Sequence, residues 1–140
     1  MTFDPTIHSQ QDLEDVWRHL MDPLGFSGRS LWLMLVDADG HPVPQLSQIE
    51  QVDTPPESDE LAGFAEIVRG LVDEFVPGGR VAFLRSRPGG PGLTPDDRAW
   101  ARVLYDVCRR AGVPVEVVHR ACDHDLVPVP MDDALPDSAA

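Results

Sequence analysis

The spacing of apolar residues near the N-terminus predicts a helix. Ser9, followed by Asp12 three positions later, is typical of an N-cap, and we expect the helix within residues 9–22, closed by Pro23 and Gly25. The apolar positions recur at helical intervals: Leu13, Val16, Trp17, Leu20 and Met21.

Two further amphipathic segments predict a second and a third helix. Thr54-Pro55-Pro56-Glu57 combines a capping box with proline at the first helical position, and Thr94-Pro95-Asp96-Asp97 repeats this arrangement. Pro77-Gly-Gly79 and Gly112 are the expected ends of the two helices. The expected buried faces are Leu61, Phe64, Ala65, Val68, Leu71, Val72 and Phe75 in the second helix, and Ala99, Trp100, Val103, Leu104, Val107 and Ala111 in the third.

Apolar runs between the helices predict strands. The first run, residues 30–37, is apolar on both faces, which suits a central strand. Pro42 and Pro44 confine the next strand to a sheet edge. A turn at Asp37-Ala-Asp-Gly40 joins these two strands as a hairpin. The expected strands are 30–37, 43–52, 80–84 and 113–119. Their order predicts an α/β (α+β) fold, a mixed sheet of about four or more strands with three helices packed on it.

Length and composition predict one globular domain over residues 1–127, followed by a flexible acidic tail at 128–140 that is rich in proline and aspartate. Net charge is −13, from 24 acidic and 11 basic residues. Because such a charge repels phosphate backbones and anionic lipid, we expect no nucleic acid and no membrane as partners.

No signal peptide or membrane span is recognisable, which predicts a cytoplasmic protein. Two cysteines are too few for a disulfide framework, and Cys108 is expected to be a buried thiol.

The most informative motif follows the strand at 80–84. Arg85-Ser86-Arg87-Pro88 leads into a glycine-rich loop, Thr94-Pro-Asp-Asp97 opens the third helix, and Gly112-Val-Pro-Val115 follows that helix. This layout is similar to the JAB (MPN-type) metalloprotease-like fold, in its RadC-like bacterial branch, whose pattern is H-x-H-P, a Gly/Pro loop and S-x-x-D. The resemblance implies a JAB/MPN-like core over residues 29–120.

In that family two histidines and an aspartate bind zinc, and a glutamate handles the proton of the bound water. Here Arg85 and Arg87 stand at the histidine places, and Asp97 stands at that of the aspartate. A guanidinium offers no lone pair to a metal. The resemblance therefore implies a metal-free relative, and we expect no metal, no cofactor and no catalytic residue. Glu50 and Glu57 lie in the region of the family glutamate, and nothing in the sequence distinguishes them.

Two functions remain open from the sequence. The first is a protein without catalytic activity that acts by protein–protein contact, as a homodimer or with another protein. The second is a protein or enzyme that binds a small anion or phosphate at the loop, where arginines, glycines and a helix N-terminus all favour negative charge. The residues that such a site would use are Arg85, Ser86, Arg87, Gly89, Gly90, Thr94 and Asp97. Against the anion site, the two arginines are equally suited to pair with Asp96 and Asp97.

Two other parts of the sequence, the segment 119–124 and the apolar face of the first helix, each allow two interpretations. His119, Cys122 and His124 are metal-capable, but structural zinc requires four ligands, so the sequence favours the end of a strand followed by a polar turn. Trp17 and Met21, continued by Leu24 and Phe26, form an apolar face that is expected to cover one side of the sheet, with a dimer surface as the alternative.

Overall fold

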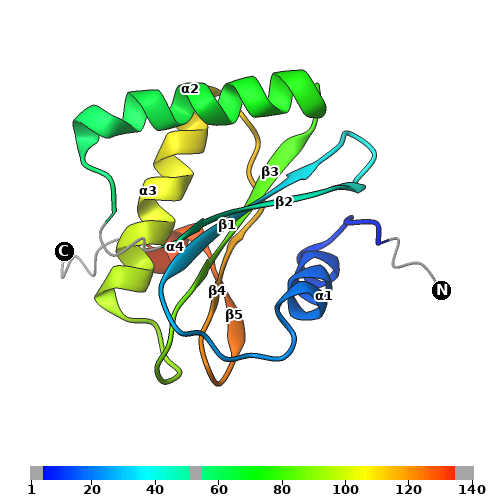
Figure 1. Cartoon of the computed structure of the whole chain (residues 1–140). Helices are drawn as coiled ribbons and strands as arrows, with labels where there is room; N and C mark the ends of the chain where they lie inside the picture. Colours follow the sequence, from blue (N-terminus) through cyan, green and yellow to red (C-terminus); the bar gives the residue numbers. More distant parts are fainter. Residues whose placement is uncertain (1–4, 51–54, 135–140) are drawn as a thin grey trace.

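The computed structural model describes residues 5–50 and 55–134, which form the helices and strands shown in Figure 1. In chain order they are α1 (Gln10–Met21), β1 (Ser30–Val36), β2 (Pro42–Glu50), α2 (Ser58–Phe75), β3 (Arg80–Ser86), α3 (Pro95–Ala111), β4 (Val118–Ala121), β5 (Leu126–Val129) and α4 (Met131–Ala134). The expected α+β class is confirmed.

The strands form one mixed sheet with the order β2-β1-β3-β4-β5. β1 and β2 are the expected antiparallel hairpin, with β2 at the edge where its prolines cost no ladder bond. β1 also pairs antiparallel with β3, β3 runs parallel to β4, and β4 pairs antiparallel with β5. The parallel pair is connected through α3, so the start of this helix lies near the carboxyl end of β3.

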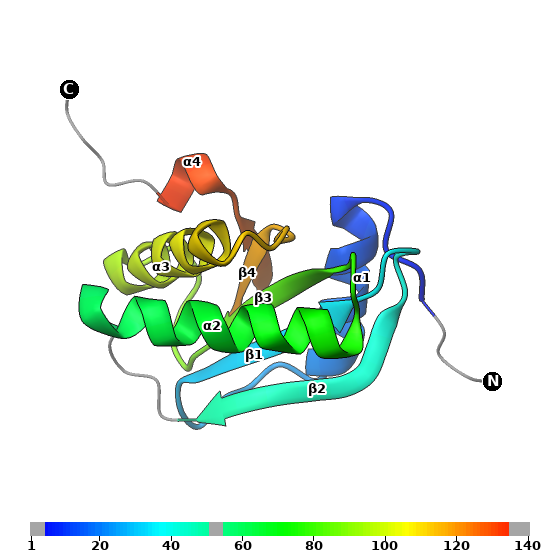
Figure 2. The same ribbon diagram turned by 90° about the horizontal axis from the view of Figure 1, so that it is seen from above.

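Helices cover both faces of the sheet (Figures 1 and 2). α2 and α3 lie on one face over Leu33, Val81 and Phe83, whereas α1 lies on the other face over Met34 and Leu84. Alternate residues of β1 and β3 thus enter two separate apolar layers, which explains why these strands are apolar throughout. Within the described part of the chain, no helix combines the length and apolarity needed to cross a bilayer.

The first helix agrees with the expectation from sequence. Ser9 caps α1 by accepting a hydrogen bond from the Asp12 N–H, at 3.1 Å. Trp17 is fully buried and Met21 is nearly so, while Leu24 and Phe26 pack partly buried beside them. The apolar face of α1 therefore covers one side of the sheet.

The start of the second helix differs from the expectation. Thr54 lies outside the described residues, and α2 begins at Ser58 rather than at Pro55. Glu57 takes the N-cap position, and its N–H donates to Glu60 Oε1. A residue that precedes proline avoids helical angles, so two consecutive prolines delay the helix. The predicted burial of Phe75 is also wrong, because its side chain is 48% exposed.

The C-terminal part of the chain requires two corrections. The last predicted strand, 113–119, is paired as β4 only from Val118, and Val115 contributes a single isolated bridge to Val81. The predicted tail begins too early, because Pro128 and Val129 belong to β5, and Met131–Ala134 form α4. β5 is an edge strand that tolerates proline, and Val129 is 1% exposed, so short apolar segments here suffice to extend the sheet.

Candidate functional site

A buried cluster of charged side chains lies where β3 and β4 end and α3 begins. Asp97 is the third residue of α3, and Arg85 and Arg120 are paired in register on the parallel strands β3 and β4. Paired residues of a sheet point to the same face, here the face that α3 covers. Arg85, Arg120 and Arg87 are only 2%, 1% and 6% exposed, and the Asp97 side chain is fully buried.

Asp97 uses both carboxylate oxygens. Oδ1 accepts from Arg85 Nη1 and from Arg87 Nε, both at 2.8 Å, and Oδ2 accepts from Arg87 Nη2 at 2.9 Å. Oδ2 also accepts from the Thr94 N–H at 2.9 Å, while the Asp97 N–H donates to Thr94 Oγ1 at 3.1 Å. Arg120 Nε lies 3.5 Å from Oδ2. The predicted capping pair of Thr94 and Asp97 is confirmed, and the Asp97 carboxylate also forms ion pairs with the arginines.

All the N–H groups of Arg87 donate hydrogen bonds within the protein. Beside its two bonds to Asp97, Nη1 donates to the carbonyls of Pro88 and Gly90, and Nη2 donates to the carbonyl of Gly92. A guanidinium has five N–H groups, and these contacts occupy all five. Arg87 therefore holds the glycine-rich loop against α3 and has no donor left for a ligand.

Arg85 and Arg120 are less fully bonded. The Arg85 guanidinium lies 5.9 Å from the centre of the Trp100 ring, and its Nη2 lies 3.8 Å from Asp96 Oδ2. Among the residues that the structure describes, Nε and Nη2 of Arg85 have no hydrogen-bond partner, and neither has Nε of Arg120. Arg120 Nη1 is hydrogen-bonded to Asp125, whose side chain is 35% exposed.

The titration of these groups follows from their surroundings. Burial alone would raise the pKa of Asp97, but the hydrogen bonds from Arg87 and Thr94 and the arginine charges outweigh it, so the pKa lies below its usual value. The pKa of Arg87 is raised by its hydrogen bond to Asp97. Burial lowers the pKa of Arg85 despite the nearby Asp97. The cluster is thus a set of ion pairs around one ionised carboxylate.

This donor set does not fit the zinc ion that the JAB/MPN resemblance would imply. Arginine has no lone pair for a metal, and both oxygens of Asp97 are already hydrogen-bonded to guanidinium groups. Three cations beside the carboxylate would also repel a divalent ion. The arginines link β3, the loop and α3 through their hydrogen bonds to Asp97 and to the loop carbonyls.

Of the other residues predicted for an anion site, the two glycines lie beside Arg87 in the loop, and Ser86 lies apart. Ser86 points to the opposite face of the sheet, where its Oγ accepts from Trp32 Nε1 at 2.9 Å. The Gly89 N–H donates to Asp123 Oδ2, and the Gly90 carbonyl accepts from Arg87. The structure therefore brings Arg85, Arg87, Thr94 and Asp97 together, while Ser86 lies apart from them.

The histidine and cysteine residues near β4 do not form a ligand group in the described part of the chain. His119 is fully buried on the α1 side, whereas Cys122 Sγ donates to Asp125 Oδ1 at 3.1 Å. The favoured interpretation, the end of a strand and a polar turn, is confirmed. Potential ligand atoms that lie within 4.8 Å of one another occur instead at Asp37, Asp39 and His41, in the β1–β2 turn. There Asp37 Oδ1 accepts from the N–H groups of Asp39 and His41, as in an ordinary polar turn.

Sequence reasoning missed Arg120 and Asp125. The expected strand ended at His119, so Arg120 fell outside it. A single arginine between Val118 and Ala121 in a buried strand was the available signal, since a charge is rarely buried without a partner.

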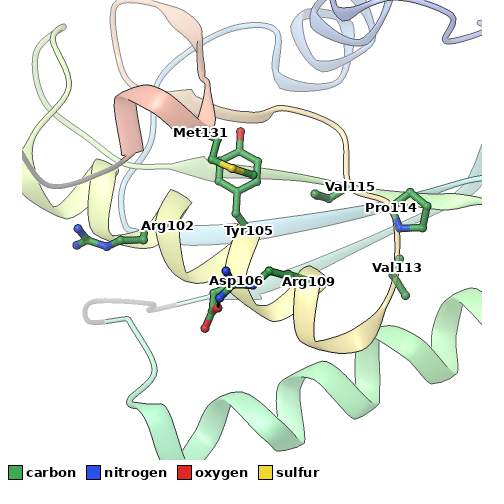
Figure 3. A pocket seen from close by; sticks show the side chains of 8 residues that line it. All are labelled: Arg102, Tyr105, Asp106, Arg109, Val113, Pro114, Val115 and Met131. Carbon is green, nitrogen blue, oxygen red and sulfur yellow. Dashed lines mark hydrogen bonds and ion pairs between the residues drawn. The ribbon is translucent and has the colours of Figure 1, made fainter.

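The hollows in the described part of the surface include an apolar groove and an apolar pocket. A groove of about 700 Å³ lies between α2 and the β1–β2 hairpin, and its walls include Leu31, Leu33, Ile49, Phe64, Ile67 and Leu71. A pocket of about 470 Å³ lies between α3, α4 and the segment before β4, as Figure 3 shows. Its apolar side chains are Tyr105, Val113, Pro114, Val115 and Met131, and its charged ones are Arg102, Asp106 and Arg109. Neither hollow is lined by Arg85 or Arg87.

A scan of the sequence against protein-family models found no match. No curated protein matched the sequence either. The resemblance to the JAB/MPN-type fold therefore stays a prediction from the motif, and the function has to be inferred from the geometry.

Proposed function

We propose that the protein is a metal-free JAB/RadC-like domain that acts by binding another protein. The observation that carries the proposal is the groove beside α2, where Ile49 and Ile67 are 50% and 63% exposed. Contiguous apolar surface of this kind marks interaction sites. The buried charge cluster supports the same conclusion, because Asp97 and Arg87 are fully engaged within the protein.

Site-specific photo-cross-linking tests the proposal. A photoreactive residue replaces Ile67 in the groove or, as a control, Leu20, which is 40% exposed on α1 across the sheet. In an extract of its own cells we expect the residue at position 67 to capture a defined protein that position 20 does not. The purified partner should then bind the wild-type protein and lose affinity for Ile67→Ser. Equal cross-linking from both positions, or no partner at either, would contradict the proposal.

Metal analysis tests the proposal that the domain is metal-free. We expect far less than one zinc ion per chain after dialysis. Stoichiometric zinc that disappears in Asp97→Ala would show that the cluster holds a metal after all.

Binding of a small anion is the second candidate, favoured by one observation. Nε and Nη2 of Arg85 are buried without a hydrogen-bond partner in the described part of the chain, and a phosphate or carboxylate oxygen would satisfy them. The test compares thermal unfolding in inorganic phosphate and in chloride at equal ionic strength. An anion site predicts a phosphate-dependent rise in midpoint that Arg85→Gln removes and Arg98→Gln, at an exposed position of α3, retains. The absence of any rise would eliminate this function.

A further inference from the structure

The walls of the groove beside α2 are apolar. Leu31 and Ile49 are opposite each other in the β1–β2 register, so both face α2 across the groove. On α2, Phe64, Ile67 and Leu71 recur at helical spacing and form the second wall. Because β2 is the edge strand, the groove is open at the side of the sheet. Its volume, about 700 Å³, lies within the range of roughly 300–1,000 Å³ that is typical of ligand clefts.

The charged residues of α2, which forms one wall, are almost all negative. α2 carries five acidic residues, Asp59, Glu60, Glu66, Asp73 and Glu74, and a single basic one, Arg69. The guanidinium of Arg69 donates to Asp73 and to the carbonyls of Ala111 and Gly112, so it is directed to the α3 side of the helix. β2 contains no lysine or arginine. The groove therefore has acidic margins without a basic residue on either wall.

Two of these acids lie on the groove side of α2. Glu60 is part of the groove wall. Glu60 and Glu74 lie seven residues before and after Ile67, and seven residues are close to two helical turns. Both side chains are exposed. They place negative charge at the two ends of the apolar stripe formed by Phe64, Ile67 and Leu71.

We infer that the groove binds a segment of a partner protein in which large apolar side chains are flanked by lysine or arginine. The inference rests on the proposed function and names the chemistry of the partner. Apolar side chains fill the groove, and the flanking cations pair with Glu60 and Glu74. A chain with net charge −13 attracts such a segment at long range and repels a second copy of itself, which argues against the homodimer alternative for this surface.

Selection from a displayed library of random linear peptides, with the intact protein as target, tests the inference. We expect enriched peptides that combine large apolar residues with lysine or arginine. Synthetic copies should lose about tenfold or more in affinity for Ile67→Ser and several-fold for Glu60→Gln combined with Glu74→Gln. Their affinity for the wild-type protein should also fall as ionic strength rises. Leu20→Ser, on the opposite face, is the matched control and should bind as the wild type does.

Glutamine at position 60 retains a side-chain oxygen for the Glu57 N–H, so the helix start is preserved in the double variant. Circular dichroism and thermal midpoints confirm that each variant is folded.

Enriched peptides without basic residues, or unchanged affinity for the double variant, would overturn the inference while leaving binding to another protein intact. Unchanged affinity for Ile67→Ser, or no enrichment, would overturn the groove as the binding site. A dimer in sedimentation velocity that Ile67→Ser abolishes would make a second copy the occupant and overturn the inference too. Binding to another protein is tested separately by the cross-linking from position 67, whose failure would contradict the proposed function itself.

Discussion

At the scale of residues, the distinctive feature is a carboxylate shared by three buried arginines. Asp97 bonds Arg85 and Arg87 directly, and Arg120 lies close to its second oxygen. Such a cluster contributes little net stability over an apolar core, because desolvation offsets most of the attraction. Its effect is instead to hold the strand ends, the loop and α3 in one arrangement. Removing Asp97 leaves buried arginine charges uncompensated.

Asp97→Asn should therefore destabilise the protein strongly. We expect a loss of about 3–5 kcal/mol in the free energy of unfolding, the usual cost of breaking a buried ion pair, measured by urea denaturation. Asp96→Asn is the matched control, because Asp96 is 55% exposed and lies 3.8 Å from Arg85, and it should cost less than about 1 kcal/mol. Equal stability of the two variants would show that the cluster is not structurally important.

His119 makes stability depend on pH. Burial lowers its pKa from 6.5 to about 4, although a hydrogen bond to the Val117 carbonyl and the charge of Glu14 act in the opposite direction. Nε2 is buried and has no partner among residues 5–50 and 55–134, so a proton there would be poorly solvated. Because the unfolded chain binds this proton more readily, the contribution of His119 is complete above pH 6.5 and declines as the pH falls towards 4.

The two pKa values of His119 differ by about 2.5, which corresponds to a loss of about 3 kcal/mol between pH 6.5 and pH 4. Denaturation at several pH values should show this decline in the wild type. His119→Leu should remove it, whereas His124→Asn, at an exposed position of the turn, should retain it. The pKa of Asp97 is lowered below 3.8, so its contribution is lost only at more acid pH. An unchanged decline in His119→Leu would assign the effect to another group.

At the scale of elements, Tyr105 of α3 connects the last two strands. Its hydroxyl accepts from the Val118 N–H at 2.9 Å and donates to the Val129 carbonyl at 2.7 Å. Val118 and Val129 are also paired in the β4–β5 register. β4 and β5 have four residues each, so one side chain that bonds both of them compensates for a short ladder.

Tyr105→Phe should loosen this end of the sheet. The substitution leaves a buried Val118 N–H without a partner, which costs about 1–3 kcal/mol. Hydrogen exchange should accelerate at the amides of β4 and β5 and stay unchanged in the β1–β2 hairpin. Uniform acceleration across the sheet would show that β4 and β5 do not open separately.

At the scale of the whole molecule, one sheet separates two apolar layers. The layer of α2 and α3 is the larger, and α1 supplies most of the cover on the other side. Trp17 is the largest fully buried side chain of that second layer. α1 is therefore required for the fold, because without it Met34 and Leu84 would face water.

Trp17→Ala should test this dependence. We expect a loss of about 3–5 kcal/mol in the free energy of unfolding, as for other large-to-small changes in cores. Leu20→Ala on the same helix, where the side chain is 40% exposed, should cost less than about 1 kcal/mol. A small effect of Trp17→Ala would mean that α1 packs on the sheet without stabilising it.

Local chemistry determined much of this architecture. Ser9, and Thr94 with Asp97, predicted two helix starts correctly, because capping depends on residues only three positions apart. The spacing of apolar residues predicted the helices α1, α2 and α3, and the turn signal predicted the β1–β2 hairpin. Pro42 predicted that β2 lies at the edge of the sheet. Gly112 also ends α3 as expected, with a positive φ of 68°.

Tertiary structure decided what depended on distant contacts. β5 has only four residues and contains Pro128, so its pairing follows from β4 and Tyr105 rather than from its own pattern. Arg120 joins Asp97 because two strands run parallel in a particular register, which no local pattern encodes. The sequence by itself determined that two arginines follow the third strand and that a capping aspartate opens the third helix. Only the packing of β3, β4 and α3 decided that these groups are buried in their own ion pairs, leaving the groove beside α2 as the exposed apolar surface.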